Sequence, residues 1–342
     1  MSTPSQVTKE HSFYEIQPNG KMCFFVDATL VKDFLICERR FMLKHVKNLR
    51  WRGEGGKSLP LVIGGWWSDV MENFYNALKD GVVIDKAKIQ EIAVKAWAEN
   101  GVEQAAASDP DKYDKFGNLP GAVLMLQEYF ESQYSIDSRI WKVIATEAGF
   151  GLNKEVFVGE SNSVVVYWVG KPDLVVVENG RLIPVDHKTV TKIDGRTIGK
   201  YKPGPQMPGY VFANEIIARS LGYTDVRVDR CIVNICAREK PAEKPRDGKK
   251  KPRFIRAYPN YTVAEIDEWR TQMVITCERM AQCIRRNEWQ WNTNSCHNIF
   301  MRDCEFLKAD SSTPAARDIV LASDFQRTAP WVPYQISKKE EE

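Results

Sequence analysis

The chain has 342 residues, of which 43% are hydrophobic and 27% are charged, a composition typical of a globular protein that is long enough for a sizeable core. No uninterrupted run of about 18 apolar residues is present, which excludes a membrane-spanning protein from the expected classes. A formal net charge of +3 is too small to indicate a polyanionic partner, so the distribution of charge matters more than its total.

The first part of the chain is predicted to be a polar arm followed by helices. The arm covers residues 1–26 and holds a short strand at MCFFVDA. It lacks the basic, apolar and cleavage regions of a signal peptide, so we expect a cytoplasmic location. Helical periodicity then predicts helices over residues 28–47, 62–79, 85–100 and 120–135.

A run of strands follows these helices. Strands are predicted near residues 140–149, 154–159, 163–169, 173–178 and 181–187. Beyond them we expect a helix from Pro208 to about Ser220, two strands around a basic loop, a long helix from about Val263 to Arg286 and a short helix after Pro314. This order predicts an α/β fold with one central mixed sheet flanked by helices.

The stretch GKPDLVVVENGRLIPVDHKT, residues 170–189, predicts a β-hairpin. Asn179 and Gly180 separate two apolar runs, and Asn-Gly is the strongest short signal for a type I′ turn, which needs positive φ at both positions. If they form that turn, Glu178 pairs with Arg181 and the register of the whole hairpin is set.

This register brings polar side chains together at the open end of the hairpin. Asp173 then lies opposite Asp186, about 5 Å away at Cα, and Lys188 points to the same face because strand side chains alternate. Two neighbouring carboxylates resist ionising together unless a positive charge lies between them, so a divalent cation is one candidate ligand. The other interpretation is a solvated strand end with a surface ion pair worth under about 1 kcal/mol.

Two further segments bear on the choice. Gln206 and Tyr210 are four residues apart, a spacing that places both side chains on one face of the predicted helix. By themselves such residues usually form a polar rim and a packed ring. Residues 238–256 carry nine Lys or Arg against three acids. This loop is either solvated or contacts phosphates, and the residues expected to do so are Lys249, Lys250, Lys251 and Arg253.

In their order and spacing, Gly-Lys-Pro-Asp at 170–173, Asp-His-Lys at 186–188 and Gln-x-x-x-Tyr at 206–210 resemble the PD-(D/E)XK nuclease superfamily. The likeness is to its RecB-like branch, which includes CRISPR adaptation nucleases, AddB-type subunits and many phage exonucleases. Pieces of the resemblance extend from about residue 27 to 335. It implies a restriction-endonuclease-like core preceded by a helical cap.

The resemblance also implies a metal-dependent phosphodiester hydrolase. The catalytic residues that it implies are Asp173, Asp186, Lys188, Gln206 and Tyr210. Mg²⁺ or Mn²⁺ would be held by Asp173, Asp186 and the backbone carbonyl of His187, since hard cations take oxygen ligands. Lys188 would orient the attacking water or neutralise charge on the phosphate, and Gln206 and Tyr210 would contact the nucleic-acid backbone.

One metal ligand of the family is absent. In IGGWWSDVMENFY, residues 63–75, Ser68 stands where the family usually has a metal-binding histidine. Either water fills that position, or Asp69 or Glu72 reaches in, or metal binding is weaker. Glu147 is a weaker candidate for a metal or supporting role, and its interpretation as an exposed strand acid is preferred.

The eight cysteines include a partial match to the iron–sulfur cluster of many RecB-like nucleases. The matching residues are Cys37 in the expected opening helix, and Cys296 and Cys304 near the C-terminus. A cluster usually needs four thiolates, and Asp310 stands where the fourth is expected. Cys283 or His297 could substitute, but we favour a packed region without a cluster.

The sequence therefore predicts a Mg²⁺- or Mn²⁺-dependent deoxyribonuclease, an exonuclease or end-processing enzyme of recombination, repair or phage DNA metabolism. The alternative is a nucleic-acid-binding module of the same fold with weakened catalysis. Expected partners are single-stranded DNA or duplex ends and a helicase or recombination protein, in the host cytoplasm if the chain is phage-encoded. The expected organisation is a single nuclease domain over 27–335, with a cap at about 28–135, a core at about 136–260, a helical part at about 261–335 and a charged tail at 336–342.

Overall fold

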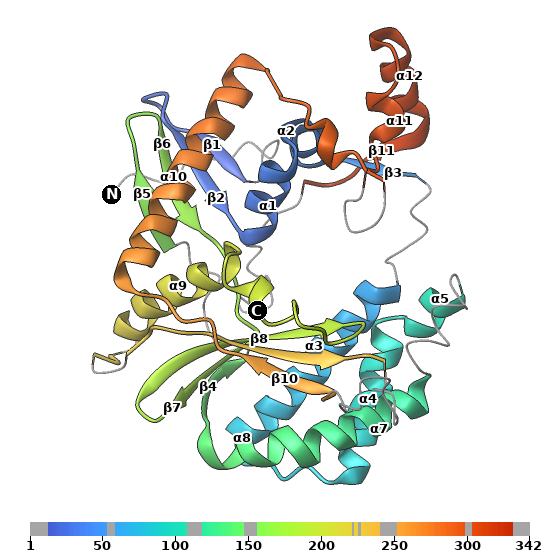
Figure 1. Ribbon diagram of the computed structural model, residues 1–342, viewed down its shortest axis with the longest axis vertical. Helices are drawn as coiled ribbons and strands as arrows, with labels where there is room; N and C mark the ends of the chain where they lie inside the picture. The colour runs from blue at the N-terminus through green and yellow to red at the C-terminus, as the bar shows by residue number, and fades with distance from the viewer. Residues whose placement is uncertain are drawn as a thin grey trace, which may run out of the picture. The chain divides into compact units, whose positions relative to one another are not determined.

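The computed structural model describes residues 13–52, 59–107, 118–146, 156–220, 222–224, 227–239, 252–297 and 303–330 (Figure 1). The chain divides into two units whose segments alternate along the sequence. Unit 1 comprises Met1–Gly55, Leu152–Gly170 and Ala264–Glu342, and unit 2 comprises Gly56–Gly151 and Lys171–Val263. Within the described ranges, no helix is both long enough and apolar enough to span a bilayer.

Unit 2 contains the central sheet. Its strands, in spatial order, are β10 (Phe254–Ala257), β9 (Ile232–Ala237), β8 (Arg181–Val190), β7 (Leu174–Glu178) and β4 (Lys142–Thr146). The β8 and β9 strands run parallel, whereas the other neighbours are antiparallel. The predicted α/β fold with a central mixed sheet is therefore confirmed.

The predicted hairpin is present as β7 and β8. Asn179 and Gly180 have φ values of 50° and 72°, as a type I′ turn requires. Glu178 pairs with Arg181, and the antiparallel register continues to Leu174 opposite Val185. Both the turn and the register follow the prediction.

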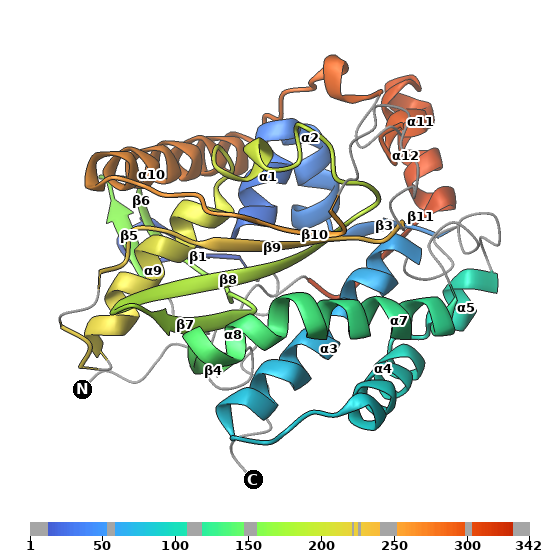
Figure 2. The same cartoon turned by 60° about the horizontal axis from the view of Figure 1, so that its bottom comes forward.

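Helices cover both faces of the central sheet, as Figure 2 shows. The helices α3 (Leu59–Lys79) and α7 (Leu119–Tyr129) lie on one face, and α9 (Gln206–Ser220) lies on the other. Ile183 and Val185 of β8 join the core beneath α3, which buries Trp66, Trp67 and Phe74. Each fully buried side chain of this size stabilises the fold by roughly 1.5–3 kcal/mol. Because strand side chains alternate, the residues between those core positions face α9.

In the described part of unit 2, the remaining helices are α4 (Lys86–Glu99), α5 (Val102–Ala107), η2 (Phe130–Tyr134), α8 (Ser135–Ile140) and η3 (Gly199–Tyr201). Side-chain caps explain where two helices begin, because Asp85 and Asn118 each accept a hydrogen bond from a backbone N–H three residues ahead. The helix α9 begins at Gln206, ahead of the predicted start at Pro208. The first four N–H groups of a helix have no intrahelical acceptor, so a proline is tolerated there.

Unit 1 holds a second sheet, so the predicted strands do not all belong to the one central sheet. Its strands, in spatial order, are β1 (Tyr14–Ile16), β2 (Met22–Val26), β6 (Val164–Trp168) and β5 (Val156–Glu160). The β6 strand pairs in parallel with β2, some 140 residues earlier, instead of with the strands that follow it. The long helix α10 (Val263–Arg286) packs on this sheet, where Trp269 meets Trp168 edge to face and Arg270 donates to the Val158 carbonyl.

The opening helix of unit 1 is broken, where one helix over residues 28–47 was predicted. It consists of α1 (Ala28–Ile36), α2 (Glu38–Phe41) and the π-helical turn η1 (Met42–Val46). Cys37 separates α1 from α2 because its backbone is extended, and its sulfur accepts the N–H of Arg40 at the start of α2. Cys37 therefore lies at a helix boundary instead of inside a helix.

The other elements of unit 1 were not predicted from sequence, apart from the helix after Pro314. They are β3 (Leu49–Trp51), β11 (Phe325–Arg327), η4 (Thr293–Ser295), α11 (Leu307–Asp310) and α12 (Pro314–Asp324). The β3 and β11 strands form a two-stranded sheet that joins segments from opposite ends of the chain. The expected division into a helical cap and a catalytic core stays a prediction.

Candidate active site

The open end of the β7–β8 hairpin brings the two predicted aspartates together. Asp173 directly precedes β7, and continuing the register by one residue pairs it with Asp186. Their side chains share the face of the sheet that α9 covers. Asp186 is only 1% exposed, whereas Asp173 is half-buried. The hairpin turn at Asn179 thus determines where both carboxylates lie.

Lys188 neutralises part of this negative charge. Its Nζ lies 3.0 Å from Oδ1 and 2.8 Å from Oδ2 of Asp186. Burial lowers the pKa of Lys188, but the carboxylates of Asp186 and Asp173 outweigh burial and raise that pKa above its usual value. The side chain is therefore an ammonium ion at neutral pH, and the three ionised groups together carry a net charge of −1.

His187 links the two aspartates through its backbone. Its N–H donates to Oδ2 of Asp173 at 2.6 Å. In an extended strand the N–H and C=O of one residue point to the same side, so the carbonyl of His187 also points toward the strand edge that carries Asp173. Its imidazole lies on the opposite face of the sheet, next to α3, where it is buried.

Gln206 and Tyr210, in the first two turns of α9, form hydrogen bonds at this strand edge. Gln206 Nε2 donates to Asp186 Oδ1 at 3.2 Å and to the Tyr210 hydroxyl at 2.9 Å. The Tyr210 hydroxyl in turn donates to the backbone carbonyl of Lys171 at 3.0 Å. Burial raises the pKa of Tyr210 well above 10, so the phenol stays neutral. Both side chains connect α9 to the segments that carry the aspartates.

The donor set suits a hard divalent cation. Two carboxylates and one peptide carbonyl are oxygen ligands of the kind that Mg²⁺ and Mn²⁺ prefer, and the net negative charge favours a cation. Among the described residues, no three His, Cys, Asp or Glu side chains converge on one metal position. A cation held here would therefore take its remaining ligands from peptide oxygens, water or substrate, as Mg²⁺ commonly does.

The structure places Ser68 on α3, the helix that packs on β8. Ser68 is half-buried and lies one helical turn beyond Gly64. Gly64 packs closely on β8, because a Cβ added to it would lie 3.8 Å from Oγ1 of Thr189. Asp69, one candidate substitute, accepts a hydrogen bond from Asn100 at 2.6 Å. Glu72 is half-buried in the same helix. Glu147 lies outside the described residues.

A buried polar chain that sequence patterns did not reveal leads to the imidazole of His187. Asn234 Nδ2 lies 3.0 Å from His187 Nδ1 and 2.6 Å from the Tyr129 hydroxyl. The Tyr129 and Tyr75 hydroxyls are 2.7 Å apart, and Tyr75 donates to Asp137 Oδ2 at 2.6 Å. These residues come from four separate elements, so no local motif connects them.

A basic segment joins β8 to α9 beside these groups. Residues 191–205 carry four basic side chains and one acid, a net charge of +3 that equals that of the whole chain. Tyr201 lies within electrostatic reach of Asp186 and Lys188: burial raises the pKa of Tyr201 to about 12, with Lys188 opposing this rise and Asp186 adding to it. The Lys200 ammonium lies over the Tyr201 ring, 5.0 Å from its centroid.

This segment has its own internal order. Asp194 and Thr197 exchange hydrogen bonds that close a turn, and the Tyr261 hydroxyl donates to the Lys202 carbonyl. Three of its basic side chains, those of Arg196, Lys200 and Lys202, belong to exposed residues. The segment therefore presents positive charge to solvent from a defined backbone.

The other predicted nucleic-acid contacts are placed differently. Lys249, Lys250 and Lys251 lie outside the described residues. Arg253 forms an ion pair with Glu128 at 2.8 Å, and its side chain is only 13% exposed. Arg253 is thus tied to α7, and Glu128 neutralises its charge.

The predicted cluster cysteines all lie in unit 1 and are buried. Cys296 Sγ accepts the indole N–H of Trp291 at 3.0 Å, and its carbonyl accepts the N–H of Cys304 at 2.7 Å. Cys283 Sγ lies 3.4 Å from a carboxylate oxygen of Glu38, while His297 pairs with Asp303. In this region too, the described residues include no group of three His, Cys, Asp or Glu side chains that could hold a metal ion.

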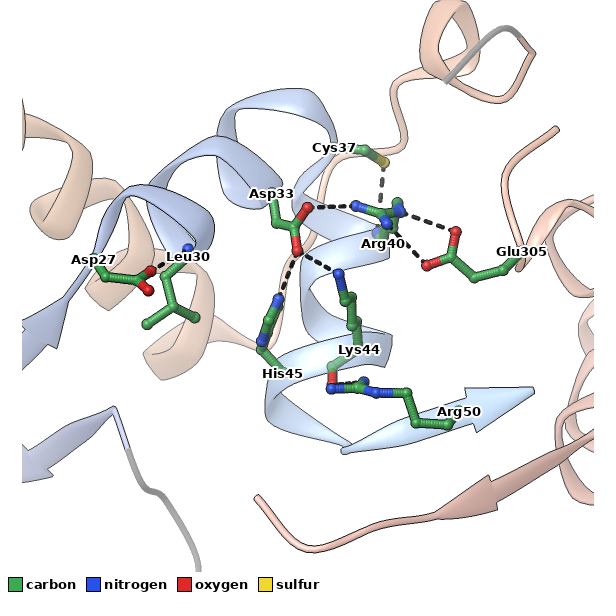
Figure 3. A network of polar contacts seen from close by, with 9 residues as sticks. All are labelled: Asp27, Leu30, Asp33, Cys37, Arg40, Lys44, His45, Arg50 and Glu305. Carbon is green, nitrogen blue, oxygen red and sulfur yellow. Dashed lines mark hydrogen bonds and ion pairs between the residues drawn. The ribbon is translucent and has the colours of Figure 1, made fainter. Parts of the chain in front are cut away.

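Ion pairs, instead, connect the opening helices to the C-terminal segment in this region (Figure 3). Arg40 lies between Asp33 at 2.7 Å and Glu305 at 2.9 Å, and Asp33 also contacts Lys44 and His45. Asp310, at the position expected for the fourth cysteine, is buried and forms an ion pair with Arg39 at 2.8 Å. A carboxylate–guanidinium pair therefore stands where a thiolate was expected.

Comparison with known proteins adds one finding. A family model described as the PD-(D/E)XK nuclease superfamily matches residues 28–308, which include every element of the candidate site. No curated protein matches the chain.

Proposed function

Because the chain belongs to the PD-(D/E)XK nuclease superfamily, we propose that it is a metal-dependent nuclease that hydrolyses phosphodiester bonds in DNA. The observation that carries this proposal is the convergence of Asp173, Asp186 and Lys188 at one strand edge, with Gln206 attached to them. Membership shows the nuclease fold. The substrate, the ion and the roles of these side chains are our proposal.

In the proposed mechanism, Asp173, Asp186 and the carbonyl of His187 would hold Mg²⁺ or Mn²⁺. When bound, the ion supplies Lewis-acid polarisation of the scissile phosphate and lowers the pKa of an attacking water. Lys188 carries a full positive charge beside this edge, where it stabilises negative charge that develops on the phosphate in the transition state. Gln206 keeps Asp186 oriented, and Tyr210 fixes the Lys171 carbonyl two residues before Asp173.

Cleavage of labelled DNA by the purified protein tests this function directly. Single-stranded and duplex substrates are compared with Mg²⁺, with Mn²⁺ and with a chelator. We expect cleavage only with a divalent ion. Products that shorten from one end would support the exonuclease or end-processing role that we favour, whereas internal cuts would support an endonuclease.

We assign the grip on the nucleic-acid backbone to the segment over residues 191–205. The ammonium of its exposed Lys200 lies over the ring of Tyr201, and the charges of Lys188 and Asp186 act in opposite directions on the pKa of Tyr201. Phosphate contacts of this kind provide affinity without sequence choice. A basic segment that leads directly from Lys188 to Gln206 can hold a strand where the proposed chemistry occurs.

The double substitution Lys200→Ala and Lys202→Ala is expected to weaken DNA binding and to reduce its salt dependence. The slope of log K against log salt should fall by about 0.7–0.9 for each phosphate contact that is lost. Fluorescence anisotropy of labelled DNA in the presence of a chelator measures this without cleavage. The control is Lys86→Ala with Lys95→Ala on α4, which removes the same charge from exposed residues of unit 2. Equal slopes for the two double variants would contradict the assignment.

A second substitution tests the role of α9. Gln206→Ala removes the amide that donates to the carboxylate of Asp186, an interaction worth roughly 1.5–3 kcal/mol for a charged acceptor. We expect kcat to fall about 10- to 100-fold, and the free energy of unfolding to fall by no more than the same roughly 1.5–3 kcal/mol. Gln206→Glu should lower kcat at least as much, because a second carboxylate would face Asp186. Steady-state kinetics with wild-type activity for Gln206→Ala would remove Gln206 from the site.

A binding module with weakened catalysis is the second candidate function. Ser68, which offers a hydroxyl where related nucleases usually have a histidine, favours this alternative. Binding of DNA without cleavage under any divalent ion would support it. The retained set of Asp173, Asp186 and Lys188 favours the enzyme, because binding alone does not need two adjacent carboxylates.

Other parts of the proposal follow from the type of reaction. We place the chain in the RecB-like branch because of its Gln206-x-x-x-Tyr210 motif. We also propose that it acts in recombination, repair or phage DNA metabolism. The DNA substrates of these processes lie inside cells, so we propose that the protein acts in the cytoplasm, or in the host cytoplasm if it is a phage enzyme. A helicase or recombination protein would be the expected partner. We propose that the chain works without an iron–sulfur cluster, since Asp310 is engaged with Arg39.

A further inference from the structure

We propose that the buried chain of Asp137, Tyr75, Tyr129 and Asn234 positions the catalytic edge by fixing the imidazole of His187 in one orientation and one tautomer. This inference rests on the proposed function, because it concerns the strand edge that would hold the metal. The four residues would act on the aspartates and Lys188 indirectly, through His187.

The direction of every hydrogen bond in the chain follows from Asp137. Its Oδ2 accepts a hydrogen bond from Arg256 at 2.7 Å, so this oxygen is also the acceptor for the hydroxyl of Tyr75. The single hydrogen of Tyr75 is then used, and Tyr75 must accept from Tyr129, 2.7 Å away. Tyr129 in turn accepts from the amide nitrogen of Asn234.

The last link sets the tautomer of His187. The second amide hydrogen of Asn234 points to Nδ1 of His187 at 3.0 Å, so Nδ1 must be the unprotonated nitrogen and Nε2 carries the hydrogen. Nε2 has no hydrogen-bond partner among the described residues. The tautomer is therefore determined at Nδ1, by the hydrogen bond from Asn234, and not by any contact at Nε2. The reverse polarity would need a protonated carboxyl of Asp137 beside the guanidinium of Arg256.

Burial makes this arrangement rigid. Asp137, Tyr75, Tyr129 and Asn234 are at most 1% exposed, and the ring of Tyr75 stacks on the imidazole of His187 with centroids 5.6 Å apart. The ring is held by Asn234 at Nδ1 and by the stacked ring of Tyr75, which leaves the side chain of His187 little freedom.

The backbone of His187 transmits this constraint to the opposite face of the sheet. Its N–H holds Asp173, its carbonyl points along the same edge, and Asp186 and Lys188 are its immediate neighbours in the strand. A shift of the imidazole would therefore move the whole Asp-His-Lys segment relative to Asp173. Partners that orient ligand residues in this way typically contribute about 10- to 100-fold in metal affinity or activity.

A matched pair of tyrosine variants tests the inference. Tyr129→Phe removes the hydroxyl at the centre of the hydrogen-bonded chain. Tyr134→Phe removes another buried hydroxyl of unit 2, which donates to the carbonyl of Phe74 and is not part of that hydrogen-bonded chain. We expect Tyr129→Phe to weaken Mn²⁺ binding, measured by calorimetry, by about 10-fold or more, and to lower kcat with little change in KM for DNA. Tyr134→Phe should change neither quantity. Equal effects of the two variants would overturn the positioning role.

The tautomer itself can be observed by NMR with ¹⁵N-labelled histidine. The protein has only four histidines, so the signal that disappears from the spectrum of His187→Gln is the resonance of His187. The wild type should show an Nε2–H tautomer, and Asn234→Asp should convert it to Nδ1–H, because a carboxylate accepts where the amide donated. An Nδ1–H tautomer in the wild type would overturn the inference. Neither this measurement nor Mn²⁺ binding needs cleavage, so failure of the nuclease proposal remains a separate result.

Discussion

Alanine at Lys188 or at Asp186 is expected to abolish metal-dependent DNA cleavage, with kcat falling by roughly 10²–10³-fold or more. Loss of Lys188 removes the ammonium that lies 2.8–3.0 Å from the carboxylate of Asp186 and faces the phosphate in the proposed mechanism. Loss of Asp186 removes a buried metal ligand and the acceptor of Gln206. Gel analysis of end-labelled DNA with Mg²⁺ or Mn²⁺ measures both variants.

The two variants should differ in their metal binding, and this difference separates the two roles. Asp186→Ala should lose affinity for Mn²⁺, whereas Lys188→Ala should gain affinity, because a competing cation leaves the carboxylates. Lys86→Ala, which removes an exposed ammonium of α4, is the control and should cleave at the wild-type rate. Wild-type cleavage by Lys188→Ala, or cleavage by the wild type in a chelator, would contradict the proposed mechanism.

Removal of the Asp137 carboxylate is expected to be the most damaging single change to stability in unit 2. Asp137 is fully buried and accepts hydrogen bonds from Arg256 and Tyr75, and the Arg256 guanidinium also lies over the Trp141 ring, 4.6 Å from its centroid. Asp137→Ala leaves that guanidinium nearly buried without its carboxylate. We expect a loss of about 3–5 kcal/mol in the free energy of unfolding, measured by urea denaturation with tryptophan fluorescence.

A double variant shows whether the unpaired charge is the cause. Asp137→Leu combined with Arg256→Met replaces both ions with apolar side chains, and it should be clearly more stable than Asp137→Ala alone. As a control, Glu99→Ala breaks only an exposed ion pair on α4 and should leave the unfolding midpoint nearly unchanged. Our explanation would be wrong if the double variant were as unstable as Asp137→Ala.

The geometry of the aspartate pair could be predicted because local rules determine it. Asn179 and Gly180 specify the turn, the turn specifies the register, and strand alternation puts Lys188 on the face of Asp186. The spacing of Gln206 and Tyr210 likewise placed both on one helix face. Each of these inferences needs only residues within about twenty positions of one another.

Features that depend on distant pairing were missed. No local signal shows that β6 joins β2 in a parallel pair, which removes β5 and β6 from the central sheet. Arg256 meets Asp137 from 119 positions away, so the polar chain behind His187 has no sequence motif. The helix break at Cys37 depends on an extended backbone that a helical pattern does not reveal.

The alternation of the two units along the chain has a consequence for synthesis on the ribosome. All segments of unit 2 emerge before residue 264, whereas unit 1 needs both the first 55 residues and the last 79. The early strands β1 and β2 therefore cannot complete unit 1 until α10, which packs on their sheet, has emerged from the ribosome. A nascent chain that is stalled once residue 263 has left the exit tunnel, but before α10 has emerged, should accordingly protect the half that bears Asp186 from protease while leaving its amino-terminal 55 residues open to digestion.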